Sequence, residues 1–119
     1  MSNQKTIGQS GYQIKEFDAV GLDVTGLKKT VADSGVLESD ASIVAGTVTV
    51  IDSTNSESIQ YSVNTVSSTV TFTVVSAANS AFDEAKDNAS TINVYYEDDQ
   101  IKVQNLSGGD VDIVLKIYS

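Results

Sequence analysis

The chain has 119 residues, a net charge of −9 and a hydrophobic fraction of 40%, values typical of one folded domain. It contains no Cys and no His, and its seven cationic residues are all Lys. These absences exclude disulfides, thiolate nucleophiles, imidazole bases and Arg contacts to phosphates or base edges, while the acidity opposes contact with nucleic acid or anionic membranes. Composition therefore favours a structural or recognition protein that is not an enzyme and uses no cofactor.

The N-terminal residues 1–11 are polar and include two Gly, which predicts an arm in front of a single domain over 12–119. Two interpretations are open: a frayed terminus, or an arm that becomes ordered against a neighbouring subunit. This end of the chain lacks the apolar core of a secretory signal, and no apolar run approaches the ~18 residues that a membrane span needs. We therefore expect that the chain is made and kept in the cytosol, or leaves it by assembly or a non-classical route, and that it has no membrane partner.

The first half of the chain is patterned unevenly. Residues 12–17 predict a weak opening strand, whereas residues 26–41 are the least regular part of the sequence. Within them, residues 27–32 fit either one helical turn or a strand, and the Ala-Asp-Ser-Gly run at 32–35 predicts a turn.

A firm period of two begins at residue 42 and predicts a series of β-strands. Apolar residues fall on one side of each run, and in runs 42–52 and 69–75 Thr falls on the other, where a β-branched polar residue suits a solvated sheet. Ser67 and Ser68 separate two of the runs and predict a two-residue turn. The strands are predicted over residues 42–52, 59–66 and 69–75.

Residues 76–88 predict the only helix. Ser80 can cap its N-terminus, and Asp83 and Glu84 fall in the first turn, where the helix dipole favours acidic side chains. A small apolar stripe would face the core; its members are Ala81, Phe82 and Ala85.

Residues 91–119 carry the clearest pattern, three short alternating runs separated by two tight turns. Such runs predict an antiparallel meander with one buried face. The residues expected to be buried are Ile92, Val94 and Tyr96, then Ile101 and Val103, then Val111, Ile113, Leu115 and Ile117.

Together the elements predict an all-β fold, namely an antiparallel β-sandwich, or a small barrel, of about seven to eight short strands with one short helix. The sandwich is preferred because the apolar faces are narrow and the helix can close one open end. Pro, a residue that guards exposed sheet edges, is absent, so open edges could be paired between subunits.

An acidic cluster follows the first strand of the predicted meander. Glu97, Asp98 and Asp99 are weak candidates for a Ca²⁺ site, since this ion prefers several carboxylate oxygens. Acidic residues are also common in exposed turns, and no EF-hand spacing is present. We therefore expect no metal at this turn.

Tyr95, Tyr118, Asn93 and Lys116 form the candidate interaction surface. In their strands they lie opposite the apolar side, and Tyr is frequent at protein interfaces and in carbohydrate stacking. A half-exposed sheet face without a partner explains the pattern equally well. No catalytic residues are predicted, because no Ser has a His to activate it.

The end of the chain resembles the short β-rich segments of tailed-bacteriophage virion proteins. The resemblance lies in residues 90–119: an Asn-Val-Tyr strand at 93–95, a Gln-Asn-Leu-Ser-Gly turn at 104–108, and a closing strand. It implies a structural role as a capsid decoration, head-fibre or head–tail accessory protein. It also implies a virion location, a partner such as the major capsid protein, and a homo-oligomer, with a trimer as one form.

These observations predict a non-enzymatic virion protein that attaches through its N-terminal arm and sheet edges. The alternative is a carbohydrate- or protein-binding immunoglobulin-like module of a fibre tip or surface adhesin. Saturable ligand binding by the isolated monomer would favour the binding module, whereas a fixed stoichiometry in a large particle would favour the assembly protein.

Overall fold

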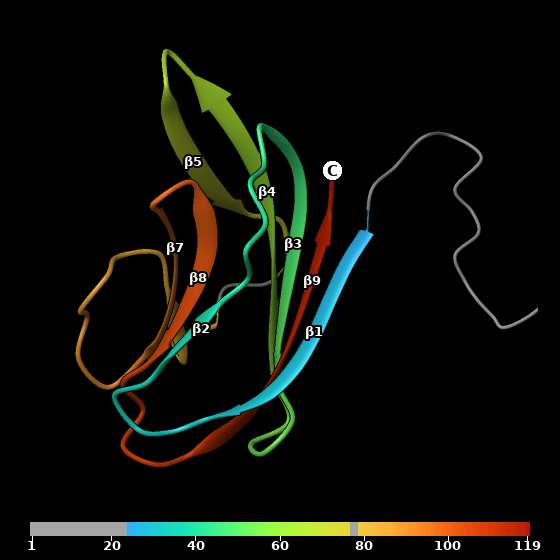
Figure 1. Cartoon of the computed structure of the whole chain (residues 1–119). Helices are drawn as coiled ribbons and strands as arrows, with labels where there is room; N and C mark the ends of the chain where they lie inside the picture. The colour runs from blue at the N-terminus through green and yellow to red at the C-terminus, as the bar shows by residue number, and fades with distance from the viewer. Residues whose placement is uncertain (1–23, 77–78) are drawn as a thin grey trace, which may run out of the picture.

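The computed structural model describes residues 24–76 and 79–119, which form nine strands in two facing sheets (Figure 1). The all-β sandwich expected from the sequence is confirmed. The predicted arm over 1–11 and the opening strand over 12–17 lie outside the described residues. The strands are β1 (Val24–Val31), β2 (Val36–Glu38), β3 (Ala45–Asp52), β4 (Glu57–Val66), β5 (Thr69–Val74), β6 (Phe82–Asp83), β7 (Ile92–Glu97), β8 (Gln100–Asn105) and β9 (Val111–Tyr118).

One sheet has five strands in the order β1-β9-β3-β4-β5, and the other has four in the order β2-β8-β7-β6. Every pairing is antiparallel except the short one between β6 and β7, which aligns Phe82 with Ile92. The edges of the large sheet are β1 and β5. The edges of the small sheet are only three and two residues long.

The core lies between the sheets because each long strand places alternate apolar side chains inward. In β4, for example, Ile59, Tyr61 and Val63 are buried while the residues between them are exposed. Tyr61 meets Phe72 of β5 edge-to-face, with ring centroids 5.6 Å apart. The other fully enclosed apolar residues include Val48, Val50, Ile113 and Leu115 of the large sheet and Val94, Ile101 and Val103 of the small one.

Local turn chemistry agrees with the sequence. Ser67 and Ser68 both have positive φ, 51° and 66°, the conformation of the type I′ turns that join hairpin strands with two residues. Asp98 and Asp99 form the corresponding two-residue turn between β7 and β8, with positive φ values of 56° and 61°. The predicted turn at 32–35 is present as well, with Ser34 at a φ of 68°.

The helix predicted over 76–88 is wrong. Its described part contains turns and the two-residue strand β6, in which Phe82 is buried in the core. Side chains there bond to the backbone locally, since Ala81 N–H donates to Asn79 Oδ1 and Ala85 N–H donates to Asp83 Oδ2. Such bonds compete with a helix, and a segment this short has little helical stability of its own.

The three strands predicted over 91–119 are all present, and the residues expected to face inward are buried except Tyr96, which is half-buried, but the meander is correct only in its first hairpin. β7 and β8 pair with each other, but β9 crosses to the large sheet and lies between β1 and β3. The crossing loop is held by Asn105, whose Nδ2 donates to Val31 O and Gly109 O at 3.0 and 2.7 Å. A run of alternating strands gives no information on which sheet each strand joins.

Candidate interaction surface

The outer face of the small sheet is covered by the loop that precedes β7. We call residues 84–91 the cover segment; it appears as the orange loop beside β7 and β8 in Figure 1. Gln104 of β8 holds it by a reciprocal pair of bonds, accepting from Asp87 N–H and donating to Asp87 Oδ1, both at 2.7 Å. Asn93 Nδ2 donates to Asn88 O at 3.0 Å and to Gln104 Oε1 at 3.1 Å.

Because of this cover, two of the candidate residues are buried, although the sequence predicts that they are exposed. Asn93 is 0% exposed and Tyr95 is 6% exposed, so neither side chain presents a contact surface. Lys86 of the cover segment places its Nζ 5.9 Å from the centre of the Tyr95 ring. Burial of Tyr95 raises the pKa of its phenol.

Lys116 and Tyr118 lie elsewhere, on the outer face of the large sheet. Lys116 is exposed and Tyr118 is half-buried in β9, between β1 and β3. The expectation that Tyr95 and Tyr118 share one outer face is therefore wrong, because their strands belong to different sheets. Alternation had placed each residue on the outer side of its strand correctly, but it could not assign the strands to sheets.

The acidic turn proposed as a weak Ca²⁺ candidate faces lysines. Lys102 Nζ lies 3.0 Å from Asp98 Oδ2 and 3.4 Å from both Glu97 Oε1 and Glu38 Oε2. Lys86 Nζ lies 2.8 Å from Glu97 Oε2, while Asp99 is exposed at the tip. Residues 24–76 and 79–119 contain no group of three or more acidic, His or Cys side chains arranged to hold a metal ion.

Lys102 is the residue whose role the sequence did not reveal. Its position in β8 is on the outer side, which predicts a solvated charge, yet it is only 5% exposed. Three carboxylates surround its ammonium group and raise its pKa, and the hydrogen bond to Asp98 has the largest effect. The surplus of acids around 97–99 was the available signal, since a buried charge needs paired partners.

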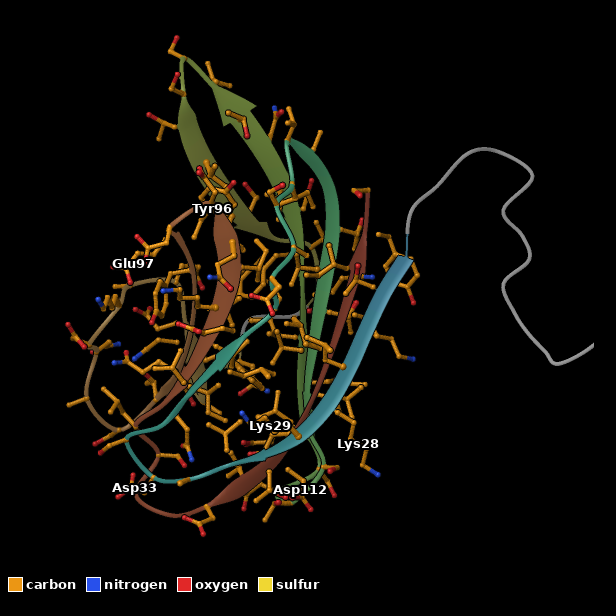
Figure 2. The ribbon with its side chains drawn as sticks, viewed as in Figure 1. Lys28, Lys29, Asp33, Tyr96, Glu97 and Asp112 are labelled. Atoms are coloured by element: carbon orange, nitrogen blue, oxygen red, sulfur yellow. The ribbon has the colours of Figure 1, made fainter. Side chains whose placement is uncertain are left out.

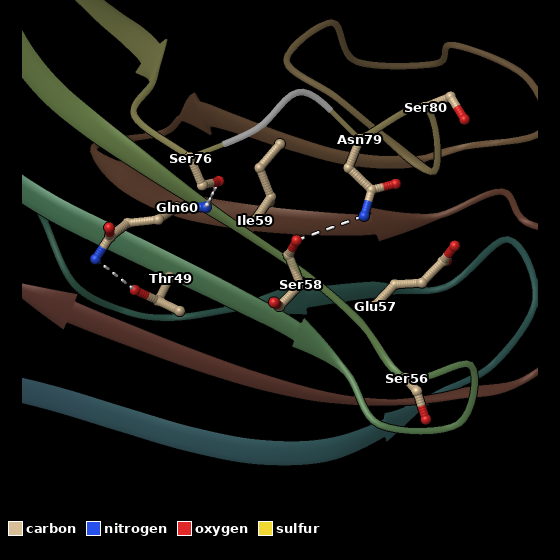
Figure 3. A pocket seen from close by; sticks show the side chains of 9 residues that line it. All are labelled: Thr49, Ser56, Glu57, Ser58, Ile59, Gln60, Ser76, Asn79 and Ser80. Carbon is tan, nitrogen blue, oxygen red and sulfur yellow. Dashed lines mark hydrogen bonds between the residues drawn. The ribbon is translucent and has the colours of Figure 1, made fainter.

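A shallow polar hollow lies along β4 where β5 has ended (Figure 3). Its volume is about 730 Å³. Two side chains bond there to the edge of β4: Asn79 Nδ2 donates to Ser58 O at 3.4 Å, and Ser76 Oγ accepts from Gln60 N–H at 3.3 Å. The described residues that line it are Thr49, Ser56, Glu57, Ser58, Ile59, Gln60, Ser76, Asn79 and Ser80.

The two edges of the large sheet differ in charge. β1 carries Lys28 on its outer side and Lys29 on the side that faces the core, and Figure 2 shows the pair on opposite sides of the strand. An inward-pointing charge on an edge strand discourages pairing with another molecule. β5, with the sequence TVTFTV, has no charge and no Pro. It is the less protected edge.

Comparison with protein-family models, with curated proteins and with solved structures finds no match to this chain. No helix in the described ranges is long and apolar enough to cross a membrane.

Proposed function

We propose that the protein is a non-enzymatic structural component of a tailed-bacteriophage particle, which joins neighbouring particle proteins through a sheet edge. The observation that carries the proposal is β5, a six-residue edge strand without charge or Pro. Main-chain groups along such a strand can bind an added strand of a partner. The resemblance of residues 90–119 to virion β-segments supports the same role.

The electrostatics support an assembly role over catalysis. In the described cluster around β7 and β8, the acidic groups of Glu97 and Asp98 neutralise Lys86 and Lys102, so these groups stabilise the fold. The described residues also present the sheet edges and the Thr-rich outer face of the large sheet, which are suited to contacts spread over a surface.

Purified particles test this role directly. An antibody against the chain should label intact particles at one structural position, and mass spectrometry should give a fixed ratio of this protein to the major capsid protein. Particles that contain none of the protein, or amounts that vary from one preparation to the next, would contradict the proposal.

A binding module remains the second candidate, and the polar hollow is the observation that favours it. Its hydroxyl and amide side chains could bond to a sugar, with Gln60 Nε2 already 3.5 Å from Thr49 Oγ1. Screening the isolated protein against glycans tests it, with Gln60→Ala expected to weaken any binding. Tyr95→Ala is unsuited to this purpose, because it would remove a buried ring and disturb the cover segment.

A further inference from the structure

The backbone of β5 offers a regular row of bonding groups on its free side. Val75 N–H donates to Gln60 O at 3.0 Å, which sets the phase of the ladder between β4 and β5. Bonding direction alternates along an antiparallel strand, so Thr69, Thr71 and Thr73 bond to β4. The N–H and C=O groups of the intervening residues, Val70, Phe72 and Val74, point to the other side, where no described strand lies.

Other parts of the sheet margin are less available for pairing with another strand. Beyond the end of β5, the side chains of Ser76 and Asn79 already bond to the main chain of β4. The opposite edge, β1, carries Lys28 and Lys29. Figure 1 shows the tip of the β4–β5 hairpin extending past the β7–β8 hairpin, and no described strand lies on the outer side of β5.

Charge restricts which part of the surface two copies of this acidic protein can bring together. The chain has a net charge of −9, but residues 58–82 contain no charged side chain at all. Two identical molecules repel each other over most of their surface and are not repelled along this hairpin. A second copy is therefore the partner for which the uncharged strand is best suited.

The sequence of β5 is also self-complementary. Residues 70–74 read VTFTV, a palindrome about Phe72. We propose that β5 pairs antiparallel with β5 of a second copy about a two-fold axis at Phe72, joining two five-stranded sheets into one. Each residue then lies opposite its own type: Phe72 opposite Phe72, Thr71 opposite Thr73, and Val70 opposite Val74.

This register satisfies both the backbone and the side chains. The outward N–H and C=O groups of Val70, Phe72 and Val74 would all meet partners, and an isologous contact of this kind closes as a dimer. The same three side chains are half-buried at the margin of the core, and the pairing extends that apolar face across the axis. Thr–Thr, Val–Val and aromatic pairs are favourable across strands.

The dimer should be weak in solution. A pair of six-residue strands is smaller than the roughly 1,200 Å² of a standard interface, so dissociation on dilution is expected. This pairing rests on the proposed function, because it assigns a second copy of the chain as a partner of the same edge strand, β5. Repeated copies in a particle would raise the effective concentration and strengthen the contact.

Charge substitutions on the exposed outer side of β5 test both the partner and the register. Thr71→Lys combined with Thr73→Lys would place introduced lysines directly opposite each other, and we expect dimerisation to weaken roughly tenfold or more. Thr71→Lys combined with Thr73→Glu would place opposite charges together, and dimerisation should return to at least the wild-type level. Sedimentation of the full chain across a wide concentration range measures each.

Ser62→Lys combined with Asn64→Lys is the matched control, since both residues are exposed on the same face of β4, one strand inward. It adds the same charge while leaving β5 intact, and at physiological salt the introduced charges are largely screened across the axis. We expect near-wild-type dimerisation. Equal weakening in the control and in the β5 double lysine variant would overturn the assigned register.

Amide exchange gives a reading that is specific to single residues. At low concentration the amides of Val70, Phe72 and Val74 should exchange rapidly, and at high concentration they should become protected. A wild-type protein that stays monomeric, or that forms trimers, overturns the pairing even if particles contain it. A dimer of this geometry that is absent from particles overturns the proposed function and leaves the pairing intact.

Discussion

At the scale of single residues, Gly46 is the glycine with the least room for a side chain among those that the structure describes. A Cβ placed there would overlap the carbonyl oxygen of Tyr118 in the neighbouring strand β9. We expect Gly46→Ala to lower the free energy of unfolding by about 1–3 kcal/mol, because β9 must move away from β3. Urea denaturation measures the loss.

Gly26→Ala in β1 is the control for this substitution, because nothing lies within 4 Å of the added Cβ. It should change the stability by no more than about 1 kcal/mol, and replacing a strand glycine can even stabilise. Comparable losses in the two variants would show that the approach of Tyr118 to Gly46 is not the cause.

Glu97 is a residue through which the stability of the fold depends on acidic pH. Its bond to Lys86 holds its pKa below the ordinary value of 4.5. A carboxyl with a lowered folded-state pKa contributes stability above the unfolded value and loses it as the pH falls through the folded one. Thermal unfolding between neutral pH and pH ~3 should therefore show a decline below about 4.5 that is smaller in Glu97→Gln. An unchanged decline in this variant would assign the effect to other carboxyls.

At the scale of elements, the cover segment depends on polar bonds to β8. Gln104→Ala removes the reciprocal pair with Asp87, and we expect the free energy of unfolding to fall by about 1–3 kcal/mol. Cleavage by trypsin after Lys86 should become faster as the segment opens. Asn88→Ala is the control, since Asn88 contributes its main-chain oxygen to Asn93 and Thr91. If both variants are cleaved alike, Gln104 is not what holds the segment.

Elements that depend on neighbouring residues were predictable, and those that depend on distant ones were not. The hairpin turns at Ser67-Ser68 and Asp98-Asp99 follow from local chemistry, and so do the inner faces of β3, β4 and β7. The placement of β9 in the other sheet depends on contacts with β1 and β3, which no periodicity encodes. The burial of Tyr95 in the candidate site could not be predicted for the same reason, since the segment that covers it has no repeating pattern.

At the scale of the whole molecule, alkali should destabilise the fold through several groups at once. Burial raises the pKa of Tyr61, to which Glu84 adds, and burial also raises that of Tyr95, while the bond to Asp98 raises that of Lys102. A raised folded-state pKa contributes stability below the unfolded value and loses it as the pH rises. Stability should therefore hold up to pH ~10 and fall above it.

Tyr61→Phe is the variant that tests this expectation. It removes a phenol that donates to Glu84 Oε2 at 3.0 Å, so the variant should be less stable at neutral pH and lose less stability in alkali. Urea midpoints between pH 8 and pH ~11 measure both effects. A wild-type midpoint that stays constant across this range would show that buried phenols do not control alkaline unfolding.

The position of β9 has a consequence in time. β1 precedes every other described strand in the chain, yet its only sheet neighbour among them is β9, which follows all the rest. At the ~5–20 residues per second of protein synthesis, roughly 4 to 17 seconds pass between the synthesis of β1 and the synthesis of β9. During this interval β1 has no partner among the described strands. Lys28 and Lys29 then act as protection for a nascent chain, discouraging premature association until the proper partner has been synthesised.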